Sequence, residues 1–555
     1  MSQITLRPFQ HNLKADVKDE WMRGAENVMM VLQTGGGKSV VMSDFVYDGV
    51  HEGKTQAVLA HRNELVNQMS CHIAKRGIPH RIIGSDTTIS QVVRSHKALF
   101  GQSFLNPSAP TAVVGVDTMI ARQGSLGSWA NQVDRWFGDE WHHCLKDNKW
   151  GKCVSLFSNA KQNLGVTATP QRADGQGLGR HSDGLMDSMV IGPSMRFLID
   201  EGYLSDYEIV CPPSDLQTHE EEIGKSGDWS SRTLKKAAEK SHIVGDVVGN
   251  YVKYAYGRKA ICFATDVETA GKIAEDFKML GIPAAALSAK TNPLVREKYL
   301  DKFRSGELLV LVNVDLFDEG FDVPDCEVCI MARPTASLGK YRQMVGRVLR
   351  FVEGKTALII DHVSNVIRHG LPERYIDWTL DRREKRAKSA PDPDDIKFTV
   401  CEGCTKPYEP FLTSCPHCGF IPPLPEPRVR NIEMVKGDLI LLDKEKLAKL
   451  RESTQLEAPA DLGRRVTAAA GVVPGKAAVN RQLEKIEAQK LLEEVIDQWA
   501  GFERHKGLGD REISKKFYMT LGFTTLEALD SSKTRSDYEK LTETVRGWYE
   551  SSNRV

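Results

Sequence analysis

The sequence has no excess of charge of either sign. Its 555 residues include 74 Lys and Arg against 74 Asp and Glu, which gives a formal net charge of zero. Small basic proteins that coat nucleic acid by bulk attraction carry a large positive charge, so that class is excluded. Any nucleic-acid partner must therefore be recognised by local features of the chain.

Long apolar runs are also missing. No stretch approaches the ~18 apolar residues that a membrane span needs, and residues 1–5 lack a signal-peptide core. We therefore expect a cytoplasmic protein with no membrane partner. The hydrophobic fraction of 41% is ordinary for a folded protein, and at ~150 residues per domain the length predicts three or four domains.

A disulfide framework is absent as well. The 11 cysteines are scattered, apart from a cluster formed by Cys401, Cys404, Cys415 and Cys418. Two Cys-x-x-Cys pairs bring four thiolates within tetrahedral reach of one Zn²⁺, and all four ligand positions are filled. The cluster predicts a structural zinc ribbon, with a redox-active dithiol as the alternative.

Short apolar runs alternate with helical patterns through the first two-thirds of the chain. They include residues 28–32 and 57–60 in one part, and 260–264 and 356–360 in another. Continuous apolar strands with helices between them are typical of buried parallel sheets, so we predict two tandem doubly wound α/β domains. The predicted organisation is domain 1 over 1–212, a linker over 213–242, domain 2 over 243–378, a linker over 379–398, the zinc ribbon over 399–422, and a mostly helical region of unknown role over 423–555.

The first apolar run leads into a glycine-rich turn, formed by Thr34, Gly35, Gly36, Gly37, Lys38 and Ser39. Glycines between a strand and a helix let backbone N–H groups face a β-phosphate. Lys38 would reach the β and γ oxygens, and the Ser39 hydroxyl would bind Mg²⁺. The stricter pattern has glycine where this chain has Leu32.

Two further groups complete a nucleotide-hydrolysing site. Asp139 would hold Mg²⁺, and Glu140 would polarise the attacking water. Gln343, Arg347 and Arg350 have the i, i+4, i+7 spacing of one helix face. The two arginines would reach the γ-phosphate across a cleft between the domains.

In chain order these motifs resemble those of superfamily 2 helicases of the DEAD/DEAH-box type, over residues 1 to about 375. The match is closer to RadD-like bacterial and prophage-encoded helicases with a C-terminal zinc ribbon, on residues 139–143, 148–152, 319–322 and 369–372. The resemblance implies two RecA-like domains that bind ATP between them. Trp141 occupies a position where the family usually carries a small residue.

The resemblance also implies roles for residues outside these groups. Gln10 would read the adenine edge, with Arg7 beside it, and Gly320 and Asp322 would contact ATP. The ATP state would be coupled to the nucleic-acid track by His142, Thr167 and Thr169. Arg62 and Thr118 would contact the nucleic-acid strand.

We therefore predict an ATP-dependent helicase or translocase that uses Mg²⁺ and acts in repair, recombination or phage replication. DNA is favoured over RNA as its partner, and a protein partner of the C-terminal region is a further option. Only about 18 residues separate the motif that contains 319–322 and ends at Pro324 from the one that begins at Gln343, which leaves little room for a strand-separating hairpin and favours translocation. An RNA helicase, or a zinc-ribbon recruitment protein with a vestigial ATPase, remains the alternative.

Overall fold

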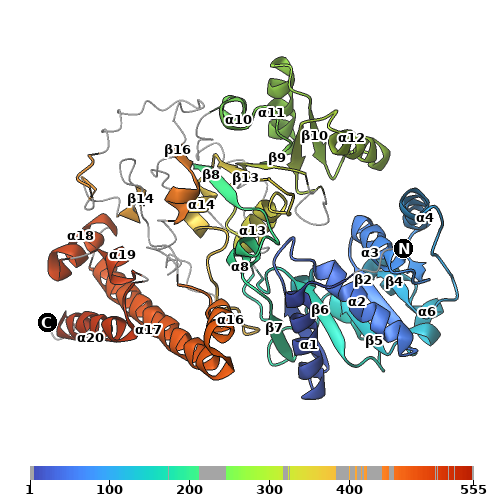
Figure 1. Cartoon of the computed structure of the whole chain (residues 1–555), viewed down its shortest axis with the longest axis horizontal. Helices are drawn as coiled ribbons and strands as arrows, with labels where there is room; N and C mark the ends of the chain where they lie inside the picture. Colours follow the sequence, from blue (N-terminus) through green and yellow to red (C-terminus); the bar gives the residue numbers. More distant parts are fainter. Residues whose placement is uncertain are drawn as a thin grey trace.

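A computed structural model describes most of the chain. The first two-thirds of the chain is described over residues 5–172, 174–211, 246–316, 323 and 325–382. Beyond it, the described residues are 399–400, 407–408, 414–415, 418–421, 440–448, and 456–552 without 507, 509, 523 and 531. Figure 1 shows the first domain at the lower right, the second above it, and the C-terminal helices at the lower left.

The first domain is built on a fully parallel sheet of seven strands in the order β3-β4-β2-β5-β6-β1-β7. Its strands are β1 (Asn27–Val31), β2 (Gln56–Ala60), β3 (Arg81–Ile83), β4 (Ala112–Gly115), β5 (Arg135–Gly138), β6 (Asn163–Thr167) and β7 (Ser188–Ile191). The central strands β1, β2, β5 and β6 are buried along their whole length, as expected for strands covered on both faces.

Helices cover this sheet and connect its strands (Figure 1). They are α1 (Pro8–Met22), α2 (Lys38–His51), α3 (Asn63–Lys75), α4 (Asp86–Phe100), α5 (Val116–Ala121), α6 (Gln123–Ala130), the 3₁₀ turn η1 (Trp141–His143), α7 (Lys149–Val154) and α8 (Met195–Asp200). Each crossover in a parallel sheet needs such a connection, because the chain must return to the same end of the sheet.

The second domain repeats this architecture. Its sheet runs β10-β11-β9-β12-β13-β8-β16, and all its pairs are parallel except the one between β8 and β16. The strands are β8 (Tyr207–Cys211), β9 (Ala260–Ala264), β10 (Ala284–Ser288), β11 (Val310–Val314), β12 (Val328–Ala332), β13 (Ala357–Asp361) and β16 (Ile440–Leu442), with helices α10 (Val247–Ala255), α11 (Val267–Met279), α12 (Pro293–Ser305), α13 (Leu338–Gly346) and α14 (Asn365–His369).

The predicted fold class is confirmed by these two sheets, but the borders differ from the prediction. β8 lies inside the segment assigned to domain 1, yet it pairs with β13 of the second sheet. β16 lies in the segment predicted to be helical, yet it closes the edge of the same sheet. Both strands join partners that are far away in sequence, and such pairing leaves no local signal.

The described part of the C-terminal region is helical, as predicted, apart from β16. It comprises α16 (Pro459–Ala470), α17 (Val472–His505), α18 (Asp510–Leu521), α19 (Thr525–Ala528) and α20 (Arg535–Ser552). Trp499 and Phe517 are buried in the core of this bundle. Within the described ranges no helix has both the length and the apolar character needed to cross a bilayer.

The cysteine cluster is described only in part. β14 (Thr399–Val400) pairs antiparallel with β15 (Pro407–Tyr408), and these strands flank the segment that holds Cys401 and Cys404. Both of those cysteines lie outside the described residues. Cys415 and Cys418 are described and belong to a short turn.

Candidate nucleotide-binding site

The glycine-rich turn of residues 34–39, which we call the phosphate loop, follows β1 and leads into α2. Gly35 and Gly37 adopt φ angles of 85° and 91°, which are left-handed conformations that favour glycine. A Cβ atom on Gly37 would lie 2.4 Å from the Gln10 amide nitrogen, so a larger residue does not fit there. The loop thus ends at Lys38 and Ser39, which begin α2 with their backbone N–H groups unused by the helix.

Gln10 and Arg7 lie beside this loop. The Gln10 Nε2 donates to the Gly36 carbonyl oxygen at 2.9 Å, and its Oε1 accepts from the Arg7 backbone N–H at 2.9 Å. The Arg7 guanidinium lies 4.8 Å from the centre of the Tyr203 ring. The structure therefore brings both predicted adenine-reading residues to the loop, with the Gln10 amide engaged by loop backbone.

The acidic pair, Asp139 and Glu140, lies at the carboxyl end of β5, which is separated from β1 in the sheet by β6. All four residues of β5 are buried although Arg135 is among them. Lys38 Nζ lies 3.9 Å from Glu140 Oε1, and both side chains are nearly enclosed, at 11% and 8% exposed. Glu140 itself has a φ of 48°, and its N–H donates to Asp139 Oδ1 at 2.9 Å. The phosphate-loop lysine and the two carboxylates are thus brought together.

The three predicted coupling residues form a chain that begins at Glu140. His142 Nδ1 lies 3.4 Å from Glu140 Oε2 and 2.9 Å from Thr167 Oγ1. Thr167 Oγ1 in turn accepts from the Thr169 N–H at 3.2 Å. A Cβ on Gly339 of α13 would lie 3.1 Å from Thr169 Oγ1, so this chain ends against the second domain.

Helix α13 and the residues after it lie directly on the phosphate loop. A Cβ on Gly346 would lie 2.6 Å from Thr34 Cβ, and one on Gly35 would lie 3.8 Å from Arg350 Cγ. Gln343 and Arg347 are both buried, at 5% exposed. The structure therefore brings the end of α13 and Arg350, from the second domain, against the loop of the first.

The prediction that Gln343, Arg347 and Arg350 share one helix face is wrong. α13 ends at Gly346, Arg347 caps it, and Arg350 forms an isolated bridge with Leu204. The Ser205 N–H also donates to the Leu349 carbonyl oxygen at 2.8 Å. Pairing with this distant segment takes the backbone out of the helix before Arg350.

Trp141 is accommodated by two glycines on neighbouring strands. Cβ atoms on Gly138 and Gly165 would lie 2.0 Å and 2.3 Å from the Trp141 side chain. The indole stacks on Trp136 with ring centres 4.3 Å apart. The large residue at this position is thus matched by missing side chains on β5 and β6.

The predicted strand-contacting residues follow neighbouring strands. Arg62 caps α3 after β2, and Thr118 lies in α5 after β4. Both therefore lie at the carboxyl edge of the first sheet. Close to Arg62, Glu64 Oε1 forms an ion pair of 2.7 Å with Arg296 of α12, which links this edge to the second domain.

Four of the predicted site residues lie outside the described residues. They are Gly320 and Asp322, assigned to the ATP site, and Cys401 and Cys404 of the zinc cluster. No group of three or more metal-ligating side chains occurs in the described part of the chain, which contains only half of the cysteine cluster.

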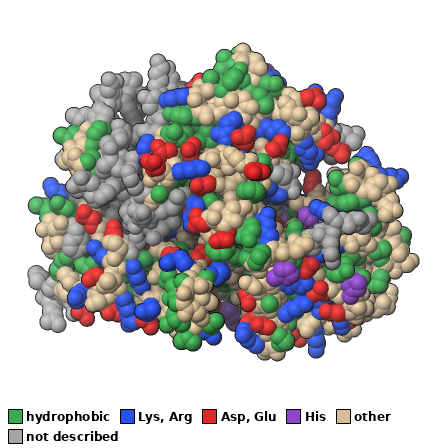
Figure 2. All heavy atoms as spheres, viewed as in Figure 1, with side chains coloured by type: hydrophobic (Ala, Val, Ile, Leu, Met, Phe, Trp, Pro, Cys, Tyr) green, Lys and Arg blue, Asp and Glu red, His purple; other side chains and the backbone are tan. Residues whose placement is uncertain are grey.

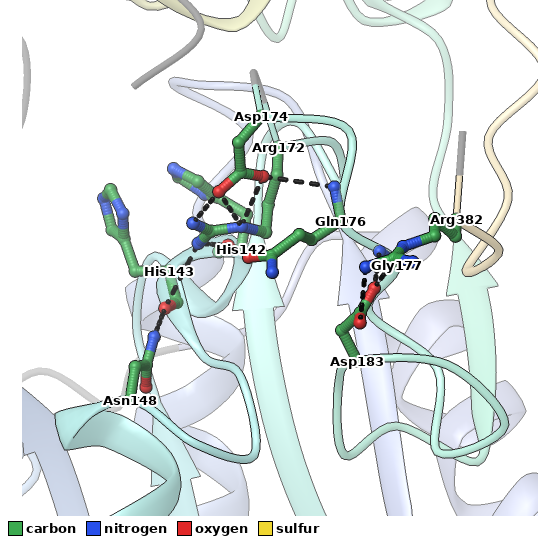
Figure 3. A network of polar contacts seen from close by, with 9 residues as sticks. All are labelled: His142, His143, Asn148, Arg172, Asp174, Gln176, Gly177, Asp183 and Arg382. Carbon is green, nitrogen blue, oxygen red and sulfur yellow. Dashed lines mark hydrogen bonds and ion pairs between the residues drawn. The ribbon is translucent and has the colours of Figure 1, made fainter. Parts of the chain in front are cut away.

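Arg172 is a residue that the sequence reasoning missed. Its guanidinium donates to the carbonyl oxygens of His142 at 3.1 Å and His143 at 3.4 Å, and its Nε donates to Asp174 at 2.9 Å (Figure 3). Asn148 Nδ2 holds the same His143 carbonyl at 2.6 Å. The only sequence signal was the position of Arg172, two residues after Pro170.

Two family models match the chain. The one described as "Type III restriction enzyme, res subunit" matches residues 3–172, and the one described as "Helicase conserved C-terminal domain" matches residues 239–352. The first range contains the phosphate loop and the acidic pair, and the second contains α13 and the residues that follow it.

Individual proteins are similar over longer stretches. A 51.5 kDa protein of a Lactococcus phage is 32% identical over 428 residues, which cover 77% of this chain and 85% of the phage protein. The Schizosaccharomyces pombe protein named "Putative mitochondrial ATP-dependent helicase irc3" is 27% identical, covering 68% of this chain and 60% of its own. The "DNA 3'-5' translocase XPB2" of Sulfurisphaera tokodaii is 29% identical, covering 49% of this chain and 66% of its own. The chain thus spans somewhat less than two-thirds of the last two proteins.

Proposed function

This chain belongs to the superfamily 2 helicases, ATP-hydrolysing proteins with two RecA-like domains, and we propose that it is a translocase that moves along DNA. The observation that carries the proposal is the approach of α13 and Arg350 to Thr34 and Gly35. A vestigial ATPase would have no need to keep basic residues of one domain against the phosphate loop of the other.

The proposed division of roles follows the two sides of this contact. From the first domain, Thr34 to Gly37 hold the phosphates through backbone N–H groups, Lys38 pairs with the β and γ oxygens, and Glu140 orients the attacking water. Ser39 and Asp139 offer the hydroxyl and carboxylate oxygens that Mg²⁺ prefers. Bound Mg²⁺ would neutralise charge on the phosphates. From the second domain, Gln343, Arg347 and Arg350 stabilise charge that develops on the γ-phosphate.

Hydrolysis then requires both domains to be in contact, because the arginines and Glu140 come from different sheets. Release of the products removes the ligand that both sides hold, so the contact weakens. Alternation between the two states would move the domains relative to each other, and a strand that binds both would be advanced. The Glu64–Arg296 ion pair lies where such a strand would pass from Arg62 and Thr118 to the second domain.

DNA is the proposed partner rather than RNA. The name of the XPB2 relative states DNA as its track, and the proposed setting is repair, recombination or phage replication. Figure 2 shows basic and acidic side chains interspersed over the visible face of the molecule. We therefore expect weak, salt-sensitive binding in the absence of nucleotide.

A variant of the proposed base tests the catalytic assignment. We expect Glu140→Gln to bind ATP but to lose nearly all turnover, because the amide cannot accept a proton from water. Nucleotide binding and steady-state hydrolysis are measured in parallel. Glu445→Gln, which changes an exposed carboxylate beyond β16, serves as the matched control and keeps wild-type turnover. Normal steady-state hydrolysis by Glu140→Gln would overturn the assignment.

The choice of nucleic acid is tested with matched strands. Hydrolysis by the wild-type protein is measured with single-stranded DNA and single-stranded RNA of the same sequence. Stimulation by DNA alone supports the proposal, whereas equal or greater stimulation by RNA indicates an RNA helicase. Binding of DNA with no ATP hydrolysis would instead favour a recruitment protein.

We also propose that Zn²⁺ joins the two halves of the cysteine cluster. The Gly419 N–H donates to the Cys415 carbonyl oxygen at 2.8 Å, and the Cys415 N–H donates to the Phe420 carbonyl oxygen at 2.7 Å. Gly419 has a φ of 74°, so this turn is tight, as a Cys-x-x-Cys metal knuckle requires. Metal analysis of freshly purified protein should give about one zinc per chain. Its absence would favour the redox dithiol.

A further inference from the structure

After α14 the chain leaves the second domain and returns to the first. We call residues 376–382 the return segment. Trp378 and Leu380, which are 8% and 9% exposed, pack into the core cluster of the first domain that also contains Trp141 and Leu178. The N–H groups of Leu178 and Gly179 both donate to the Leu380 carbonyl oxygen at 2.9 Å. The segment is thus built into the first domain although it follows the second.

The return segment contacts the loop that connects β6 to β7. Arg382 Nε lies 3.1 Å from Asp183 Oδ2, and the same carboxylate accepts from the Gly177 N–H at 3.0 Å (Figure 3). A Cβ on Gly177 would lie 2.7 Å from the Arg382 nitrogen, so the two backbones are in close contact. This loop therefore has its conformation set from the return segment.

The other end of the same loop holds the turn that carries His142. Asp174 accepts from the Gln176 N–H at 3.1 Å and from Arg172, which in turn donates to the His142 and His143 carbonyl oxygens. In Figure 3 these contacts run from the η1 turn through Arg172 and Asp174 toward Gly177 and Arg382. A displacement of the return segment would therefore be transmitted to the backbone of the η1 turn, which carries His142.

Trp378 also faces the second domain. The guanidinium of Arg342, on α13 next to Gln343, lies 5.6 Å from the centre of the Trp378 ring. Arg342 is buried and donates to the Arg374 carbonyl oxygen, and burial lowers its pKa to about 10. A cation held against an aromatic ring away from water fixes the two groups relative to each other more firmly than an exposed pair would.

We infer that Trp378 is a positioning residue for ATP hydrolysis. Its ring lies between Arg342 of α13 and the first-domain core, and through the return segment and Arg172 it aligns the His142 turn with the position of α13. The inference rests on the proposed function, since it concerns the same site. Trp378 touches neither the phosphate loop nor the acidic pair in the contacts described, so its effect is indirect.

The chain offers a matched control in Trp129. This residue is 7% exposed, belongs to the same core cluster, and also has an arginine over its ring, with the Arg81 guanidinium 4.6 Å from the ring centre. It has no described contact with α13. Trp129→Leu and Trp378→Leu should therefore lose similar stability, while only one of them should change catalysis.

The test is steady-state ATP hydrolysis with single-stranded DNA, on full-length protein whose folding is checked by thermal unfolding. We expect Trp378→Leu to lower kcat about tenfold while KM for ATP stays within about twofold, because positioning is lost but the binding groups remain. Trp378→Phe, which keeps an aromatic ring under Arg342, should recover most of kcat, and Trp129→Leu should keep it.

A second variant covers the case in which Trp378→Leu does not fold. Asp174→Asn weakens the hold on Arg172 without changing the core, and the same loss of kcat at nearly constant KM is expected. Equal kcat for Trp378→Leu and Trp129→Leu, or a wild-type kcat for Asp174→Asn, would overturn the inference. A wild-type protein that does not hydrolyse ATP would overturn the proposed function instead.

Discussion

The two RecA-like domains have the same strand order but different proposed roles in ATP hydrolysis. When the two sheets are aligned from the same edge, β1 is equivalent in position to β8, β5 to β12 and β6 to β13. In the first domain the carboxyl ends of the strands lead to the phosphate loop, the Asp139–Glu140 pair and Thr167. The equivalent ends of β12 and β13 in the second domain lead to Arg333 and Asp361. One fold thus carries the proposed phosphate-binding groups at its strand ends in one copy, whereas the proposed arginine fingers of the other copy, Arg347 and Arg350, follow α13.

The acidic groups of the second domain are engaged by their own surroundings. Asp361 is buried and accepts the N–H groups of Val363 at 3.1 Å and Val366 at 2.7 Å, while burial raises the pKa of its carboxyl group. Asp315, after β11, pairs with Lys340 at 2.9 Å and with Arg333. These carboxylates therefore stabilise loops, whereas Asp139 and Glu140 stand beside a phosphate loop.

The strongest test of the different roles proposed for the two domains is to replace one basic residue in each. Lys38→Ala should weaken ATP binding and abolish hydrolysis, because Lys38 pairs with the bound phosphates. Arg347→Ala should keep ATP binding and lower kcat by about 10³-fold, since an arginine finger acts on the transition state. Nucleotide titrations and steady-state kinetics measure the two effects. If Arg347→Ala weakened binding as much as Lys38→Ala, the proposed division of roles would fail.

The contact between the domains is tested at Gly346. A Cβ at this position would lie 2.6 Å from Thr34 Cβ, so Gly346→Ala should hold α13 away from the phosphate loop. We expect kcat to fall about tenfold or more, because the arginines are displaced from their positions, with little change in the thermal midpoint. Gly271→Ala in α11, where a Cβ would meet nothing within 4 Å, is the control. Equal kcat for the two variants would contradict the closed contact.

A third test concerns packing that exists only in the first sheet. Trp141→Ala should cost about 3–5 kcal/mol of stability in the first domain, because it empties a large volume between β5 and β6. Gly138→Ala should cost about 1–3 kcal/mol through overpacking. The two changes should not be additive, since the alanine at 138 fills part of the space that the indole leaves. Urea unfolding of both single variants and the double variant measures this, and strict additivity would exclude the proposed fit.

The last expected effect is a pH dependence of the stability of the first domain. Ser70, His80 and His96 form a buried network in which His80 Nδ1 donates to the Ile78 carbonyl oxygen at 2.9 Å. Its Nε2 therefore accepts from the Ser70 hydroxyl at 2.6 Å, and the ring is neutral. Burial lowers the pKa of His80 to about 4.

The sign follows from the unfolded chain, where this histidine has a pKa of about 6.5 and binds a proton first. The stability that the neutral ring contributes is present above pH 6.5 and is lost as the pH falls from about 6.5 to 4, by about 3 kcal/mol in all. Urea unfolding across this range should show the loss in the wild type and a flatter profile in His80→Gln. An unchanged slope in the variant would assign the acid sensitivity to other groups.

Much of the fold could be predicted because its signals are local. The run 260–264 coincides with β9, and the run 57–60 lies within β2. Cys326 and Cys329, in a similarly apolar stretch, are fully enclosed at β12 and just before it. Buried parallel strands must be apolar throughout, so composition alone reveals them.

The rest of the site depended on contacts between distant residues. Arg350 was predicted on a helix face, but pairing with Leu204 removes it from α13. Gln10 was predicted at an adenine edge, and its amide is bonded to the phosphate-loop backbone. Trp378 was assigned to the end of the second domain, and it packs into the first. Each of these positions is decided by a partner more than 25 residues away, which no local periodicity can reveal.

By itself, the sequence determined the class of the protein and the parts of its site. Glycine spacing, a lysine and paired carboxylates after apolar strands have few chemical uses other than phosphate binding and hydrolysis. Only the tertiary structure decided how the parts meet: which strand closes the second sheet, how α13 lies on the phosphate loop, and that the return segment joins both domains. The physical reason is that chemistry is carried by residue type, whereas alignment arises from packing and pairing between segments that are far apart along the chain.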